Sequence, residues 1–366
     1  MITPRFLRNV LIKGLVIFAV INLVWAAFNP SLGKLSSYNI LFEGRERLPF
    51  GEDSARAYNL SLYDLDAMFA SHKLAGSTKA TNEFRVFVIG DSASWGTLLK
   101  PEETLAGRLD SAGLKTASGK EVKVYNLGYP TLSLTKDVMI LEYAMQYQPD
   151  LILWLVTLES FPRERQLLSP IVVNNQQRVA KLINGYGLNL TPPEGTSSFW
   201  DKTIIGQRRA LADLLRLQFY GVMWSATGVD QTYPADYEPA ARDLEADDTF
   251  RDWAPPTIPD DGLALDVVHA GMQVAGKVPV VLINEPMLVS TGENSDSRYN
   301  FYYPRWAYDQ YRLAFSESCS VNSWPCLDLW DVVPQERFTN SAIHLDPLGE
   351  GILMEEIIKS NIFFNY

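Results

Sequence analysis

The sequence predicts an α/β protein: a three-layer α/β/α sandwich around a five-stranded, mainly parallel sheet, preceded by one N-terminal transmembrane helix. Short apolar runs rich in β-branched and aromatic residues alternate with segments whose apolar residues lie three or four positions apart. The runs are mainly apolar without a strict alternation, which is typical of parallel strands covered on both faces. A chain of 366 residues with 47% hydrophobic residues can bury such a core in one large domain or two small ones.

The expected strands and helices alternate in chain order. The predicted strands cover residues 84–89, 122–127, 151–157, 278–284 and 327–332. The predicted helices cover residues 102–112, 134–147, 263–275, 305–316 and 347–361. Strands and helices that alternate in this way give parallel pairing, with helices on both faces of the sheet. We therefore expect one sandwich domain over residues 83–366.

Residues 10–28 form an apolar stretch with Lys13 as its single charge, close to the roughly 20 residues that cross a bilayer. Arg5, Arg8 and Lys13 crowd its amino side, so the positive-inside rule leaves residues 1–9 in the cytoplasm. The main domain is then extracytoplasmic, periplasmic or at the cell surface, and the lipid bilayer is a partner. The alternative is a cleavable signal peptide, because Val24-Trp25-Ala26 resembles a small-residue cleavage site.

Two stretches depart from the alternation of strand and helix. Residues 29–82 are interpreted as a membrane-proximal linker segment, with a short helix at 58–69 and a solvated His72. Residues 162–261 are interpreted as an insertion that holds one amphipathic helix, 201–223, and then an acidic, proline-bearing loop. Such an insertion forms either a lid or substrate wall, or a surface excursion.

The composition excludes some partners and ligands. A net charge of -11 repels phosphate backbones, so we expect no nucleic acid partner. Two cysteines and three scattered histidines form no local ligand cluster, so we expect neither a metal nor a cofactor. Cys319 and Cys326 would close a short disulfide loop in an oxidising compartment, whereas in the cytosol they would be two buried thiols.

Gly90-Asp91-Ser92 directly follows the first predicted strand, at the sheet edge where ligands bind in open α/β folds. A serine there can act as a nucleophile, and the backbone amides beside it can stabilise negative charge on a substrate oxygen. On its own the tripeptide is also typical of an ordinary turn. His344 changes this balance, because it stands in a loop before the last predicted helix and its side chain suits proton transfer.

The segments around these residues resemble the blocks of the SGNH/GDSL hydrolase family. VFVIGDSASWG resembles the serine block, YNLGYPTLS the glycine block, and the loop with His344 the histidine block, in family order over about three quarters of the chain. The resemblance implies a three-layer fold, Ser92 as nucleophile, His344 as general base, and an oxyanion hole made by the amides of Ser92 and Gly128. With its anchor, the chain is most similar to the membrane-tethered branch that includes the alginate O-acetylation and lipoteichoic acid D-alanylation proteins.

Two positions depart from the family pattern. The family has an aspartate three residues before the histidine, where this chain has Ser341 with the equally uncharged Asn340 beside it. The family's oxyanion asparagine after the third strand corresponds to Glu159, whose ionised carboxylate would oppose a developing oxyanion. Three explanations stay open: Glu159 is protonated or itself orients His344, the site is impaired, or another aspartate orients the histidine, namely Asp328, Asp331 or Asp346.

The expected function is serine-dependent acyl-ester chemistry outside the cytoplasm, by an O-acyltransferase or esterase acting on a cell-surface glycan or acyl carrier. Serine attack would form an acyl-enzyme that a sugar hydroxyl or water resolves. Only the resemblance to the anchored branch implies transfer, and with it a membrane-embedded acyltransferase partner. The alternatives are a secreted esterase and a catalytically impaired accessory or glycan-binding subunit of a membrane assembly.

Overall fold

The computed structural model describes residues 3–37, 44–51, 58–192, 198–229, 233 and 236–364. Parts of the expected cytoplasmic segment, linker, insertion and carboxyl end therefore lie outside the described residues: 1–2, 38–43, 52–57, 193–197, 230–232, 234–235 and 365–366.

The centre of the molecule is a five-stranded sheet in which every pair of neighbouring strands is parallel. The strands lie in the order β2-β1-β3-β4-β5. Their bounds are β1 Glu83–Ile89, β2 Glu121–Asn126, β3 Leu151–Val156, β4 Val280–Asn284 and β5 Cys326–Asp328. All residues of β1, β3 and β4 are buried, as their mainly apolar sequences predict, and the two charged residues of β1 are buried as the Arg85–Glu83 ion pair. The predicted fold class is confirmed.

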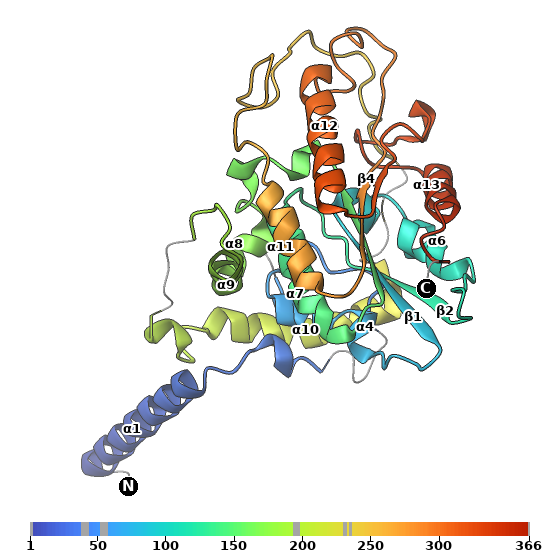
Figure 1. Ribbon diagram of the computed structural model, residues 1–366. Helices are drawn as coiled ribbons and strands as arrows, with labels where there is room; N and C mark the ends of the chain where they lie inside the picture. Colours follow the sequence, from blue (N-terminus) through green and yellow to red (C-terminus); the bar gives the residue numbers. More distant parts are fainter. Residues whose placement is uncertain are drawn as a thin grey trace.

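Helices cover both faces of the sheet (Figure 1). Successive strand residues point to opposite faces, so Phe87 joins one core cluster and Val86 joins the other. The Phe87 face packs against α7 Leu134–Ala144, α11 Leu265–Ala275 and α12 Arg305–Asn322. The Val86 face packs against α6 Leu105–Ser111 and α13 Pro347–Lys359.

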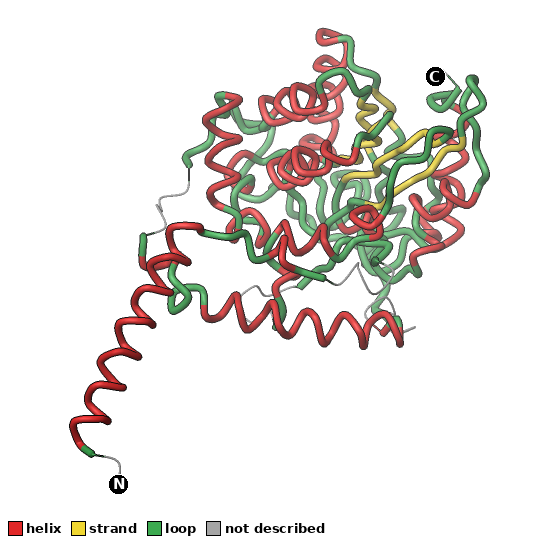
Figure 2. Tube along the Cα trace, turned by 90° about the horizontal axis from the view of Figure 1, so that it is seen from below, coloured by secondary structure: helices red, strands yellow, loops and turns green. Residues whose placement is uncertain are grey.

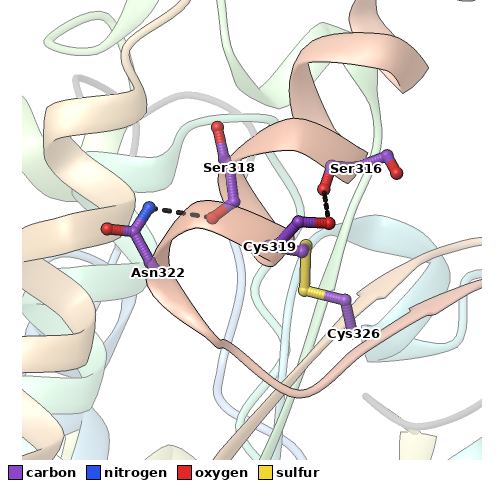
Figure 3. Close-up of a disulfide and its surroundings, with 6 residues drawn as sticks. Ser316, Ser318, Cys319, Asn322 and Cys326 are labelled. Atoms are coloured by element: carbon purple, nitrogen blue, oxygen red, sulfur yellow. Dashed lines mark hydrogen bonds between the residues drawn. A yellow bond between two sulfur atoms is a disulfide. The ribbon is translucent and has the colours of Figure 1, made fainter.

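The edge strand β5 is shorter than predicted and is fixed by contacts at both ends. Asn284 at the end of β4 donates through Nδ2 to Asp328 Oδ1 at 2.7 Å, and Leu329 N donates to Asn284 O at 2.9 Å. At its other end, Cys326 forms a disulfide with Cys319 in the last turns of α12 (Figure 3). The helix runs to Asn322 rather than to the predicted end at 316, which brings Cys319 over the start of β5.

Residues 29–82 are part of the body and not a linker, as far as they are described. They form η1 Gly33–Leu35, η2 Leu60–Leu62, α3 Leu65–Ala70 and α4 Lys73–Gly76. Leu65 and Phe69 are fully buried in the same cluster as the sheet, because the apolar face of α3 closes the end of the layer formed by α7. His72, expected to be solvated, is also buried, and its Nε2 lies 3.1 Å from the carbonyl oxygens of Glu46 and Asn126.

The insertion is more helical than predicted. Its short helices are η6 Arg163–Arg165, α8 Pro170–Asn174, α9 Gln176–Tyr186 and η7 Trp200–Lys202, and η5 Leu158–Ser160 lies just before it. The predicted helix at 201–223 is observed as η7 followed by α10 Arg208–Thr227. α10 lies across the base of the body, as Figure 2 shows from below.

The apolar N-terminal stretch forms one helix, α1 Pro4–Phe28, that extends away from the body (Figure 1). Its length and composition suffice to cross a membrane, and only 11% of its most apolar window is buried. Its carboxyl end is attached to the body: Trp25 Nε1 donates to Gln207 Oε1 at 2.9 Å, and Asn22 Oδ1 accepts from Ile205 N at 3.3 Å.

Glu350 on α13 gives the fold a pH dependence. Burial raises its pKa to about 8, and its Oε2 has no hydrogen-bond partner in the described part of the chain. Because this folded-state pKa lies above that of an unfolded glutamate, the stabilisation is present below about pH 4.5 and is lost as the pH rises through about 8. We predict that the free energy of unfolding of the wild type falls with rising pH over this range more steeply than that of Glu350→Gln. The difference between the two slopes is up to about 1 kcal/mol per pH unit.

Urea unfolding of the full chain in detergent at several pH values between 5 and 8 measures this difference, with about 1 kcal/mol per pH unit as the scale. Glu355→Gln is the matched control, because Glu355 is on the same helix with an exposed side chain. Parallel stability curves for the wild type and Glu350→Gln would contradict the assignment.

Candidate active site

Ser92 is held at the carboxyl edge of the sheet by a turn that only glycines allow. It begins the short helix α5 Ser92–Trp95, and the Asp91 side chain accepts from Ala93 N at 2.8 Å to cap it. A Cβ on Gly90 would collide with Ser94 and lie 3.0 Å from Leu155 O. A Cβ on Gly128, in the loop after β2, would lie 2.6 Å from Trp95 N. The two loops therefore pack backbone against backbone beneath Ser92.

The loop that carries His344 is closed on itself. Phe338 and Leu345 form an antiparallel bridge, and Thr339 N donates to His344 O at 2.8 Å. Asp346 then caps α13 by accepting from Gly349 N at 2.7 Å, with Pro347 in the first turn. The sequence Asp-Pro thus starts the last helix and fixes the histidine two residues before it.

Ser92 and His344, 252 positions apart, meet at this edge. His344 Nε2 lies 2.8 Å from Ser92 Oγ, and His344 Nδ1 lies 2.8 Å from Asn340 Oδ1. Because Asn340 presents its oxygen, Nδ1 carries the proton and donates it, which leaves the Nε2 lone pair to accept from the serine hydroxyl. The arrangement is a serine–histidine–asparagine triad in which the orienting group is neutral.

Burial lowers the pKa of His344 to about 4. The imidazole is therefore neutral at pH 7 and can act as a base. No carboxylate of the described residues contacts its ring, which accounts for the absence of an opposing upward shift of this pKa.

None of the four carboxylates considered as orienting groups for His344 is hydrogen-bonded to its ring in the described part of the chain. Glu159 is 4% exposed and forms an ion pair with Arg251, whose Nε donates to Glu159 Oε2 at 2.9 Å. Glu159 therefore does not orient His344. Asp328 accepts from Arg312 at 2.6 Å, Asp331 is exposed, and Asp346 caps α13. Ser341 is buried beside Asn340, which alone takes the Nδ1 contact among the described residues.

The two expected oxyanion donors differ in their availability. The Ser92 amide has no hydrogen-bond partner within the described ranges and can donate to a substrate oxygen. The Gly128 amide instead donates to Asn126 Oδ1 at 3.0 Å, and Asn126 Nδ2 donates to Ser94 O at 3.0 Å. Asn126 thus joins the two loops, but its side chain already accepts the hydrogen bond of the Gly128 amide, the second expected oxyanion donor.

A buried lysine that the sequence analysis did not identify connects the loops after β1 and β2. Lys136 in α7 is 0% exposed, and its Nζ donates to Gly90 O at 2.7 Å and Tyr129 O at 3.1 Å. It also pairs with Asp137 Oδ1 at 2.6 Å. The available signal was a Lys-Asp pair within an otherwise apolar helical segment, because a buried ammonium needs partners of this kind.

Two buried carboxyl groups, Asp91 and Glu285, interact electrostatically in the core next to Ser92. Glu285 follows β4, and neither of its carboxyl oxygens, nor Asp91 Oδ2, has a hydrogen-bond partner among the described residues. Burial raises the pKa of Glu285 well above its usual range, and the neighbouring Asp91 raises it further. Two adjacent buried carboxyl groups of this kind resist ionising together.

Comparison with known proteins gives only distant likenesses. No protein-family model and no curated protein matches the chain. A member of the lipolytic protein G-D-S-L family from Veillonella parvula is 8% identical, with 75% of this chain and 96% of that chain covered and a TM-score of 0.35. The inhibitor-bound aryl esterase of M. smegmatis is 13% identical, with 75% and 98% covered and a TM-score of 0.34.

A carbohydrate acetylesterase family member from Sinorhizobium meliloti is also 13% identical, with 75% of this chain and 97% of that chain covered and a TM-score of 0.34. These proteins are esterases or lipolytic proteins by description, and the resemblance to the membrane-anchored branch finds no support among them. Likenesses this weak carry no argument about the chain's activity, which has to come from the geometry of its own residues.

Asn340→Asp tests the role of the neutral third residue. A carboxylate in place of the amide would stabilise the imidazolium, so we predict that the pKa of His344 rises from about 4 by at least one unit. Proton–nitrogen NMR of histidine-labelled protein measures the titration, with the signal assigned from His344→Gln. Asn340→Ala is the control, because it removes the contact without adding charge. An unchanged His344 titration in Asn340→Asp would show that position 340 does not face the ring.

Proposed function

We propose that the protein catalyses serine-dependent acyl-ester chemistry, as an esterase or O-acyltransferase. The observation that carries the proposal is the contact between Ser92 Oγ and His344 Nε2, with Asn340 behind the ring. A hydroxyl hydrogen-bonded to a neutral imidazole, at the edge of a parallel sheet and beside a free amide, is the arrangement that nucleophilic attack on a carbonyl requires.

The reaction follows from these groups. Ser92 Oγ attacks the ester carbonyl while its proton passes to His344 Nε2, and the Ser92 amide donates to the resulting oxyanion. The imidazolium then gives that proton to the departing alcohol, which leaves an acyl group on Ser92. Water or a sugar hydroxyl repeats the sequence in reverse: it loses a proton to His344 and releases the acid or the new ester.

The neutral Asn340 has a kinetic consequence. It holds the tautomer with the proton on Nδ1, but it does not offset the positive charge that the ring acquires in the transition state. A low pKa of the imidazolium also means that the neutral His344 imidazole is a weak base, which limits proton removal from the serine. We expect a slower enzyme than one with an aspartate, by roughly one to three orders of magnitude in kcat.

The proposed location is outside the cytoplasm, with α1 as the membrane anchor. The basic residues Arg5, Arg8 and Lys13 on the amino side of α1 support a cytoplasmic N-terminus. The Cys319–Cys326 disulfide supports the same placement, because disulfides persist in oxidising compartments.

The proposed substrate is an acyl ester of a cell-surface glycan or an acyl carrier. The insertion supports a wall beside the site: Ala240 N donates to Thr339 O at 2.8 Å next to Asn340, and Arg251 pairs with Glu159. The guanidinium offsets the carboxylate at the position where the family has its oxyanion asparagine. Transfer with a membrane-embedded acyltransferase partner is proposed on the resemblance of the sequence blocks alone.

Ser92→Ala tests the proposal. We predict that the full chain in detergent hydrolyses p-nitrophenyl acetate and is labelled by a fluorophosphonate probe, and that Ser92→Ala abolishes labelling and lowers turnover at least about 100-fold. Ser94→Ala is the matched control, because this hydroxyl lies in the same turn, buried and without a hydrogen-bond partner among the described residues. No labelling and no turnover of the wild type between pH 5 and 9 would favour the accessory or glycan-binding subunit instead.

A further inference from the structure

The outward face of α10 is apolar although it is exposed. Its exposed apolar side chains follow one another at helical spacing: Leu215, Phe219, Val222 and Met223. Phe219 is 77% exposed and Leu215 is 63% exposed. A contiguous apolar stripe of this kind marks an interaction surface on a soluble body.

The stripe is not the side on which α10 packs against the body. Leu214, Leu217 and Trp224 on the opposite face are buried against Leu32 and Leu60. The helix is thus apolar on both faces, and its outward face needs a different apolar environment.

The position of α10 indicates what that environment is. Hydrogen bonds from Trp25 to Gln207 and from Ile205 to Asn22 fix the segment just before α10 at the carboxyl end of α1. In both views, α10 lies along the edge of the body on the side toward which α1 extends, and it runs across the direction of α1 (Figures 1 and 2).

The residues around this face are those of a membrane interface. Trp200 just ahead of α10 is 71% exposed, and tryptophan is enriched where lipid headgroups meet acyl chains. Residues 199–229 carry four basic and two acidic residues in a chain whose net charge is -11. Two of the bases, Arg208 and Arg209, lie in the first turn of α10, where they can contact lipid phosphates.

We infer that α10 is a second membrane contact, which lies in the interface of the outer leaflet with Leu215, Phe219, Val222 and Met223 in the acyl chains. The inference rests on the proposed placement of α1 in the membrane. The Trp25–Gln207 contact then places the start of α10 at the level where α1 leaves the membrane. One helix alone would let the body rotate and tilt. Two contacts fix its orientation, and with it the direction in which the Ser92 edge of the sheet faces.

The test uses the full chain in liposomes with a polarity-sensitive fluorophore on single introduced cysteines. The two native cysteines are in the disulfide, so only the new thiol reacts. Phe219→Cys reports on α10, and Leu15→Cys, 67% exposed on α1, reports on the anchor. Leu313→Cys is the matched control, since Leu313 is 71% exposed and its helix, α12, lies away from α10 (Figure 1). Lipids brominated on their acyl chains quench only fluorophores that contact those chains.

We expect at least twofold quenching at positions 15 and 219 and none at 313. Quenching at 15 without quenching at 219 would overturn the inference and leave the anchor in place. No quenching at either position would overturn the membrane placement of α1 and the inference with it. A blue-shifted but unquenched signal at 219 would also contradict the inference, because a second protein copy would then cover the face.

Discussion

The close approach of the loops after β1 and β2 is the constraint on which the site depends. A Cβ on Gly128 would collide with the backbone of the loop after β1, and a Cβ on Gly90 would collide with Ser94 in its own loop and lie 3.0 Å from Leu155 O of β3. Lys136 then binds a carbonyl from each loop with one buried ammonium. Because Lys136 pairs with both carbonyls, the turn that presents Ser92 is held in place, and His344 on a distant loop can be aligned with it.

Charge around Ser92 is balanced mainly by pairing. Asp137 offsets Lys136 and Arg251 offsets Glu159, while burial and the neighbouring Asp91 raise the pKa of Glu285. Unpaired charge in such a buried region would cost several kcal/mol, about 3–5 for a broken pair. The exception is His344, whose ring contacts the neutral Asn340, so that the imidazolium of the proposed reaction would have no counter-charge.

Most of the fold could be predicted from the sequence, and the site only in part. Continuous apolar strands and helical periodicity identify every strand and the five helices that cover the sheet, because these patterns follow from burial alone. Residues 29–82 were misread because their apolar residues, such as Leu65 and Phe69, have no partner apparent in sequence until the fold supplies one. Asn340 was named as a possible acid position, but its contact with His344 depends on the conformation of the loop that they share. Lys136 was missed because its contacts with Gly90 and Tyr129 join segments that are distant in the sequence, which no local pattern encodes.

The central claim is that Ser92 becomes covalently acylated during turnover, with His344 as its base. Acid quenching of the full chain during p-nitrophenyl acetate turnover, followed by peptide mass spectrometry, tests it most directly. The account predicts an acetyl group on the peptide that carries Ser92 in the wild type, and none on that peptide in His344→Gln. Turnover with an unmodified Ser92 peptide, or equal acetylation of Ser92 in the variant without His344, would contradict it.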